Sequence, residues 1–146
     1  MVRKILFALM LTASMLFVGK AEDRPIRFEQ LPEAAKAFVR THFNESDVTL
    51  VLLDKEVLST SYEVKLVDGM SIDFDAKGEW KDVDGGFVEV PSAIIPAKIA
   101  SFVNANHART KIVKISRNRR FYEVELNNDL EIVFDRKTME FKRYDN

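Results

Sequence analysis

The sequence contains no cysteine, and this absence removes several classes of protein at once. Disulfides, thiolate metal sites and a thiol nucleophile all require cysteine, and so does a lipid anchor attached to an N-terminal cysteine. A chain of 146 residues without disulfides must be held together by burial of an apolar core, which this length allows.

Glycine and histidine are also scarce. The five glycines form no phosphate-binding loop, no dinucleotide-binding fingerprint and no Gly-x-Ser-x-Gly nucleophile turn. The two histidines, His42 and His107, do not form a pair at helical spacing, which disfavours a transition-metal site, so we interpret both as helix-end residues. These absences favour a protein that is not an enzyme and that binds no cofactor and no metal.

The longest apolar run lies at the N-terminus. Two basic residues precede an apolar segment from Ile5 to Val18, and Gly19 and Ala21 supply small residues at the −3 and −1 positions of a cleavage site. These features predict a signal peptide over residues 1–21 and a periplasmic or secreted location for the remaining chain. An uncleaved membrane anchor is the alternative.

The chain after the signal peptide is mildly acidic. Without residues 1–21 it keeps 19 of its 22 Lys and Arg residues against 23 Asp and Glu residues, a net charge of −4. This charge disfavours nucleic acid as a partner, and we expect no membrane association after cleavage because no second apolar run follows. Residues 22–30 are predicted to be a loose polar lead-in.

The remaining sequence contains two similar halves. The segment YEVKLVDGMSIDFD at Tyr62–Asp75 matches YEVELNNDLEIVFD at Tyr122–Asp135 without a gap, at an offset of 60. Upstream, LPEAAKAFV in the first half is similar to IPAKIASFV in the second. The sequence therefore predicts two tandem repeats, at residues 31–85 and 90–146.

Each half begins with apolar residues at helical spacing and continues with apolar and polar residues in alternation. In the first half Pro32 suits the first helical turn and the apolar stripe extends to Phe43; in the second half the helix begins at either Ser92 or Ile95. We predict an α+β fold in which each repeat packs one helix on a four-stranded antiparallel β-meander, and in which the two sheets can align edge to edge. The predicted strands are 48–53, 62–66, 70–74 and 79–83 in the first half, and 111–116, 122–126, 130–134 and 140–144 in the second.

The segment DFDAKGEWKDVDGG resembles the calcium-binding loop of an EF-hand. Asp73, Asp75 and Asp84 occupy positions 1, 3 and 12 of that loop, and Gly78 occupies the turn position 6. However, Asp73 lies in a pattern of strand alternation, whereas an EF-hand loop is flanked by helices, and a lysine occupies position 5. We therefore interpret the residues from Asp75 to Gly78 as a hairpin turn.

The repeated motif Tyr-Glu-Val-x-Leu, a turn and x-Ile-x-Phe-Asp, with Gly-x-Trp after the first copy, resembles the PepSY-like family of periplasmic proteins. That family is similar in fold to the beta-lactamase inhibitor protein, a tandem of helix-on-sheet units. The resemblance covers nearly the whole chain after residue 21 and brings no catalytic residues with it. PepSY domains are associated with peptidase propeptides and peptidase inhibition, which implies a protein-binding role by analogy of fold. The second copy departs from the motif where Thr138 replaces the turn glycine.

The candidate binding surface is the face of the sheets that the helices leave uncovered. We predict that this face recognises a protein or peptide in the cell envelope, and an inhibitor-like role is one form of this hypothesis. A small-ligand carrier and an envelope enzyme are the alternatives. The strand VTLVLL is apolar on both faces, so its second face requires a cover, either the other repeat or a partner. The predicted partner-binding residues are Phe121, Glu123, Glu125, Val133, Glu63, Lys65, Leu50 and Leu52.

The loop RNRR at residues 117–120 is compact and basic. We interpret it as a solvated hairpin tip, with contact to an acidic partner as the alternative. Trp80 and Phe141 hold equivalent places in the two halves, and we expect both to close the core.

Overall fold

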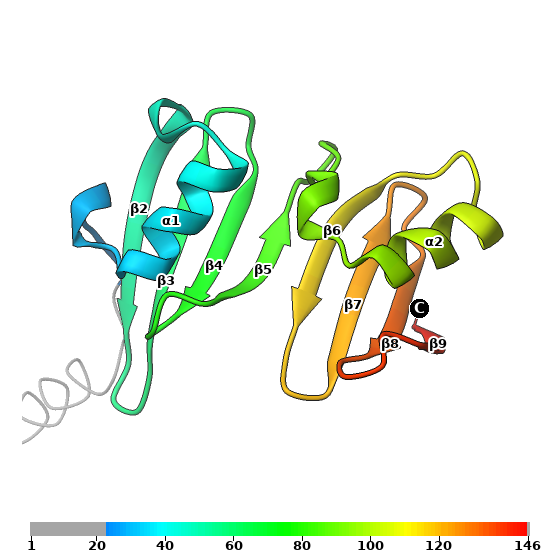
Figure 1. Ribbon diagram of the computed structural model, residues 1–146. Helices are drawn as coiled ribbons and strands as arrows, with labels where there is room; N and C mark the ends of the chain where they lie inside the picture. The colour runs from blue at the N-terminus through cyan, green and yellow to red at the C-terminus, as the bar shows by residue number, and fades with distance from the viewer. Residues whose placement is uncertain (1–22, 146) are drawn as a thin grey trace, which may run out of the picture.

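The computed structural model describes residues 23–145, which form two α-helices and one open antiparallel sheet of nine strands (Figure 1). Every strand pairs with the next strand along the chain. The α+β class is therefore confirmed, while the predicted signal peptide lies outside the described residues. Within residues 23–145, no helix has the length and apolar character needed to cross a membrane.

The predicted strands are all present, and their ends differ from the prediction by no more than two residues. In the first half, the elements are β1 (Asp23–Pro25), α1 (Glu33–His42), β2 (Val48–Lys55), β3 (Thr60–Leu66), β4 (Ser71–Asp75) and β5 (Trp80–Asp84). In the second half, they are α2 (Ala97–Asn106), β6 (Ile112–Arg117), β7 (Phe121–Leu126), β8 (Glu131–Asp135) and β9 (Phe141–Asp145).

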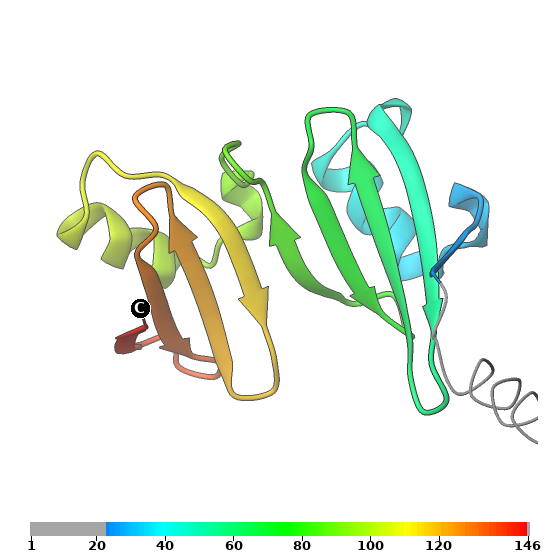
Figure 2. The same cartoon turned by 180° about the vertical axis from the view of Figure 1, so that it is seen from behind.

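Both helices lie on the same face of the sheet. Figure 1 shows α1 and α2 in front of the strands, and Figure 2, from behind, shows the strands in front of both helices. Alternation in the strands explains the arrangement, because every second side chain points to the helices. The fully buried residues of this layer include Val64, Ile72, Phe74, Val124, Ile132 and Phe134 from the strands, and Ala35, Val39 and Ile99 from the helices.

One phenylalanine of each helix packs on one phenylalanine of the sheet. The ring of Phe38 meets the edge of Phe74 with centroids 5.7 Å apart, and Phe102 meets Phe134 in the same way at 5.4 Å. Such edge-to-face pairs add about 0.5–1.5 kcal/mol to the free energy gained by burial. These rings fill the space between helix and sheet in both halves.

The two halves share one sheet because β5 pairs with β6. The pairing is short and joins Asp82 to Ser116, Val83 to Ile115 and Asp84 to Lys114. Side chains of the central pair, Val83 and Ile115, are fully buried. The predicted edge-to-edge alignment is therefore present, as one open sheet with nine strands instead of eight.

The ninth strand, β1, comes from the segment predicted as a lead-in. It pairs with β2, joining Asp23 to Asp54 and Pro25 to Leu52. Its side chains are exposed, so the strand is held by backbone hydrogen bonds and not by apolar burial. An edge strand is the position in a sheet that tolerates a proline, which has no N–H to donate.

Helix α2 begins later than either predicted start. Ser92–Ile94 form a short 3₁₀ turn, and the α-helix begins at Ala97, directly after Pro96. A proline disfavours the helical conformation in the residue before it, so Ile95 is extended and the helix starts on the other side of Pro96.

The turn between β4 and β5 is the predicted hairpin. The N–H of Gly78 donates to the carbonyl of Asp75 at 3.0 Å, and Asp75 Oδ1 accepts from the N–H groups of Lys77 and Glu79, both at 2.9 Å. Gly78 has φ +86°, and a Cβ added to it would lie 2.9 Å from the backbone nitrogen of Ala35 in α1. In the second half the left-handed position is Met139, at φ 60°, and not Thr138.

Candidate functional site

The sheet face opposite the helices carries two rows of acidic side chains, and we call it the helix-free face. In the first row, Glu63 on β3 lies opposite Asp73 on β4, and Asp73 lies opposite Asp82 on β5. Like charges directly opposite each other on neighbouring strands destabilise a sheet. The three carboxylates of the first row therefore repel one another across three adjacent strands.

The second row lies in the other half of the sheet. Glu125 on β7 is opposite Glu131 on β8, and Glu131 is opposite Asp145 on β9. Glu123, the next outward-facing residue of β7, adds a further carboxylate to this half. Both halves of the face are therefore acidic over three adjacent strands.

Two lysines and one arginine compensate part of this charge. Arg143 Nε donates to Asp145 Oδ1 at 3.0 Å in the second row. Lys114 Nζ lies between the halves, 3.9 Å from Asp82 Oδ1 and 4.0 Å from Asp84 Oδ2. Lys65 Nζ lies 3.7 Å from Glu63 Oε1. Ion pairs of this kind between solvent-accessible groups contribute between zero and about 1 kcal/mol each, so they do not remove the repulsion within the rows.

The carboxylates of the face are also partly removed from water. Burial raises the pKa of Asp82 to about 6, opposed by the charge of Lys114 and reinforced by Asp73 and Asp84. Burial and the neighbouring charge of Glu63 raise the pKa of Asp73. Because the ionised forms are disfavoured here, the charge of the face depends on pH in the mildly acidic range.

A raised pKa is found in the second half as well. Burial raises the pKa of Glu123, and the charges of Glu131 and Asp145 act in the same direction. In both halves, carboxyl groups are therefore partly removed from water and lie close to other negative charges. A cationic partner would reduce the repulsion between these charges.

Four of the predicted partner-binding residues are polar, and all four lie on this face. Glu63 and Lys65 alternate with buried residues of β3, and Glu123 and Glu125 alternate with buried residues of β7. Lys65 is exposed, and the three glutamates are half-buried.

The predicted apolar residues of β2 also lie on this face. Leu50 is opposite Lys65 and is 37% exposed, and Leu52 is opposite Glu63 and is half-buried. The second half of the chain does not cover them, because the strand order places β2 three strands away from β5, the strand that joins the second half. Packing between the halves, one of the two predicted covers for this strand, is therefore excluded.

Phe121 and Val133 behave differently from each other. Phe121 is half-buried, with the guanidinium carbon of Arg143 lying 5.3 Å from its ring centroid. Arg143 is on β9 and Phe121 on β7, so the arginine side chain crosses β8, where Val133 is only 1% exposed. The expectation that Val133 is an open apolar contact is therefore corrected: it lies on this face but beneath other side chains.

Several residues of the face were not among the predicted site residues. Asp82 and Asp84 flank the buried Val83, and Lys114 precedes the buried Ile115, so strand alternation alone assigns them to this face. Arg143 could not be found in this way, because its contact with Phe121 depends on the pairing of β8 with β9.

The EF-hand-like aspartates occupy ordinary sheet and turn positions. Asp75 Oδ1 is already an acceptor for two N–H groups of its turn, and Asp84 Oδ1 accepts from the N–H of Gly86 at 2.9 Å. Over residues 23–145, no three His, Cys, Asp or Glu side chains are arranged so that they could hold a metal ion.

The comparisons with known proteins agree with the fold and the location. Residues 60–142 match the family model described as "Putative beta-lactamase-inhibitor-like, PepSY-like". A solved structure from Bacteroides thetaiotaomicron, described as a "putative calcium-regulated periplasmic protein", is 40% identical, with a TM-score of 0.81, and the match covers 85% of this chain and 97% of that one.

Two structures from Bacteroides vulgatus, both described as putative periplasmic proteins, are also similar. They are 35% and 38% identical, with TM-scores of 0.80 and 0.79; the matches cover 88% and 86% of this chain and 100% of theirs. A search of curated proteins found no match. The chain belongs to the PepSY-like family, as its repeated motif indicated, and it is a periplasmic protein.

Proposed function

We propose that this protein is a non-catalytic binding module whose helix-free face recognises a basic segment of a protein or peptide in the cell envelope. The observation that carries the proposal is the pair of acidic rows, Glu63–Asp73–Asp82 and Glu125–Glu131–Asp145. Each directly opposed like-charge pair opposes folding by roughly 0.2–1 kcal/mol. A face with a purely structural role has no need of such pairs, whereas a cationic partner neutralises them on binding.

Apolar side chains at the two ends of the charged area support a macromolecular partner. Leu50 and Leu52 are on β2, next to the first row. Phe121 is on β7 in the second half, two residues from Glu123. Protein interfaces combine apolar contacts with charged groups that set orientation and partner choice. An inhibitor-like role, as in the proteins of similar fold, is one form of this proposal.

We also propose that the binding face arose by duplication of one helix-and-strand unit. The matched positions support this: Phe38 and Phe102 pack on Phe74 and Phe134 with similar geometry, and each acidic row begins on the strand that carries the Tyr-Glu-Val-x-Leu motif. Duplication would give the face two similar halves on one continuous sheet.

The positions of the histidines favour a binding role over an enzyme. His107 Nε2 and the hydroxyl of Tyr144 form a hydrogen bond at 2.9 Å, and His42 packs against Phe38 with centroids 4.7 Å apart. Both histidines lie at the ends of the helices, on the other side of the sheet from the acidic rows. Likewise, the phenylalanine rings between helix and sheet occupy the space that a small-ligand carrier would need.

The similar protein from Bacteroides thetaiotaomicron is described as "putative calcium-regulated". The side chains of this chain do not fit a calcium site, because Asp73, Asp75 and Asp84 are distributed over two strands, β4 and β5. Asp75 and Asp84 also already accept hydrogen bonds from backbone N–H groups, at the turn after β4 and after the end of β5. We therefore propose that calcium does not regulate this protein.

The test is affinity capture from an envelope extract with three versions of the protein. The wild type is compared with the triple variant Glu63→Gln, Asp73→Asn, Glu125→Gln and with a matched control, Glu56→Gln, Glu89→Gln, in exposed loops. The triple variant loses like-charge repulsion, so we expect it to fold at least as well as the wild type. A partner retained by wild type and control but lost by the triple variant supports the proposal, and equal recovery by all three versions contradicts it.

A further inference from the structure

A cleft of about 640 Å³ lies at the junction of the two halves, on the helix side of the sheet. The pairing of β5 with β6 ends at Asp82 and Ser116, so the beginning of β5 and the end of β6 are not part of the strand pairing. Trp80 and Arg117 line the cleft, and their strand partners, Phe74 and Tyr122, are both buried core residues. The cleft therefore opens on the face opposite the acidic rows.

The lining of the cleft carries more positive than negative charge. Its cations are Lys81, Arg117, Arg119 and Arg136, and its anions are Asp75 and Glu79. The anions are already engaged: Asp75 accepts the turn hydrogen bonds, and Glu79 Oε2 lies 3.6 Å from Arg117. In the part of the chain that the structure describes, Lys81, Arg119 and Arg136 form no ion pair.

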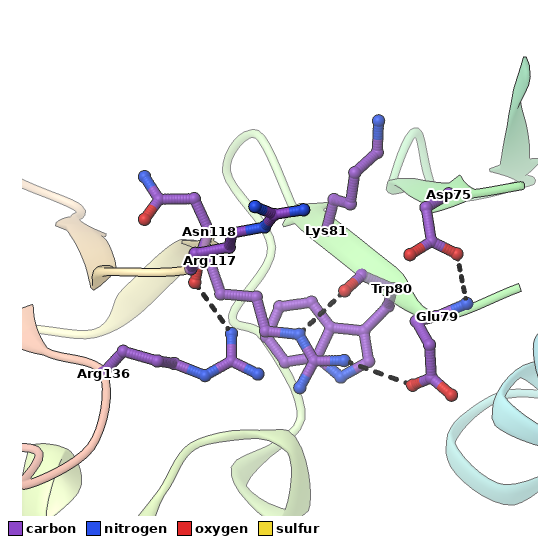
Figure 3. Close-up of a pocket in the computed structure, with 8 residues that line it drawn as sticks. Asp75, Glu79, Trp80, Lys81, Arg117, Asn118 and Arg136 are labelled. Carbon is purple, nitrogen blue, oxygen red and sulfur yellow. Dashed lines mark hydrogen bonds and ion pairs between the residues drawn. The ribbon is translucent and has the colours of Figure 1, made fainter. Parts of the chain in front are cut away.

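Two of the arginines are each held in place by an aromatic ring and a backbone carbonyl. Figure 3 shows Arg117 beside Trp80 and Arg136 beside the Asn118 carbonyl. The guanidinium of Arg117 lies 3.9 Å from the ring centroid of Trp80, and its Nε donates to the Trp80 carbonyl at 2.8 Å. The guanidinium of Arg136 lies 4.8 Å from the Tyr122 ring and donates to the Asn118 carbonyl at 3.2 Å.

These contacts leave donors unused. A guanidinium has five N–H donors, and the contacts above use only some of those on each arginine. Because the side chains are already ordered, a ligand that accepts the remaining hydrogen bonds avoids much of the entropy loss that usually opposes binding to long side chains. The remaining N–H donors of both arginines are therefore available to an acceptor from outside the chain.

We propose that this cleft binds a small organic anion through an oxyanion group, a carboxylate or a phosphate, held by Arg117 and Arg136 with Arg119 at the rim. The planar fork of a guanidinium matches both groups, and the volume of the cleft lies within the usual range for small-molecule sites. The site borders the helix-free face, because Lys81, Arg117 and Asn118 of its lining also line hollows on that face.

The experiment uses Trp80, the only tryptophan in the sequence, as a reporter inside the cleft. Tryptophan emission is recorded while the protein is titrated with citrate, with inorganic phosphate and with sodium chloride at matched ionic strength. We expect a saturable change with citrate or phosphate and no saturable change with chloride. Saturation by citrate alone assigns a carboxylate ligand, and saturation by phosphate alone assigns a phosphate ligand.

Two single variants locate the binding, and a third is their matched control. Arg136→Gln and Arg119→Gln each remove a charge from the cleft, and Arg24→Gln removes one from the exposed strand β1. We expect Arg136→Gln to weaken the anion at least about tenfold, Arg119→Gln to weaken it less, and Arg24→Gln to leave it unchanged. Circular dichroism establishes that each variant is folded.

Nuclear magnetic resonance of the arginine Nε–H groups provides a second reading of the same titration. We expect the Nε–H signals of Arg117 and Arg136 to shift with the anion, in step with the tryptophan emission. The proposal is overturned if neither measurement shows saturation with citrate or phosphate, or if Arg24→Gln weakens binding as much as Arg136→Gln does.

Discussion

Asp82 at the centre of the helix-free face gives the sharpest stability prediction. Its pKa is raised from the ordinary value of 3.8 to about 6 in the folded protein, because the carboxyl is partly buried and lies beside Asp73 and Asp84. The folded state therefore binds more protons than the unfolded state between these two pH values. By linkage, the Asp82 carboxylate lowers the free energy of unfolding as the pH rises through this window, and the loss is complete above about pH 6.

The magnitude follows from the size of the shift. Raising the pKa from 3.8 to about 6 corresponds to roughly 3 kcal/mol in the free energy of unfolding. The carboxyl keeps partial contact with water, and solvent screening lowers this effect to about 1–2 kcal/mol. Asp82→Asn removes the ionisation and keeps the shape of the side chain. We therefore expect the variant to be about 1–2 kcal/mol more stable than the wild type at pH 7 and less than about 0.5 kcal/mol more stable at pH 4.

The assay is urea unfolding, followed by circular dichroism at pH 4, 5, 6 and 7. The matched control is Asp129→Asn in the turn between β7 and β8, where φ is 68° and asparagine is well tolerated. We expect the control to change stability by no more than about 0.5 kcal/mol at any pH. An Asp82→Asn variant that is less stable than the wild type at pH 7, or equally stabilised at pH 4 and pH 7, would refute the reasoning.

Three further predictions concern packing and calcium. Gly78→Ala should lower the free energy of unfolding by about 2 kcal/mol or more, because its Cβ would meet Ala35 and Pro32 in addition to the strain of a positive φ. Gly69→Ala, which has φ +91° and no atom within 4 Å of the added Cβ, should cost only about 1 kcal/mol, and equal losses would contradict the proposed turn-to-helix contact. Phe102→Ala should lower the free energy of unfolding by about 2–4 kcal/mol, because the ring packs on Phe134 and Phe141. Phe87→Ala on the surface should change it by less than about 0.5 kcal/mol. Similar losses in the two variants would disprove the packing account. Millimolar calcium should shift the melting temperature by less than about 1 °C, and a saturable rise of several degrees would show that a calcium site exists.

The elements that could be predicted from the sequence are those with long periodic patterns. The alternation from Tyr62 to Leu66 and from Phe121 to Leu126 specifies both a strand and its buried side, so the outward position of Glu63 and Glu125 was predictable. Strand β1 has three exposed residues and no apolar pattern, and only its backbone pairing with β2 reveals it.

The arginine cleft could not be predicted, because it depends on how the two halves meet. The sequence predicts a solvated basic tip at residues 117–120 and places Trp80 in the core. Trp80 does pack on Phe38, with centroids 6.0 Å apart, but the Arg117 side chain above it is only 17% exposed. Their stacking requires that β5 pairs with β6, and no periodic pattern in either half specifies that pairing.

The central claim is that the helix-free face is the surface that meets a partner. The most direct measurement is photo-crosslinking in living cells, with a photo-reactive amino acid in place of exposed Lys65 on this face or exposed Asn104 on the outer side of α2. The account predicts a discrete crosslinked partner from position 65 and none from position 104. Crosslinks from position 104 alone, or from neither position, would contradict it.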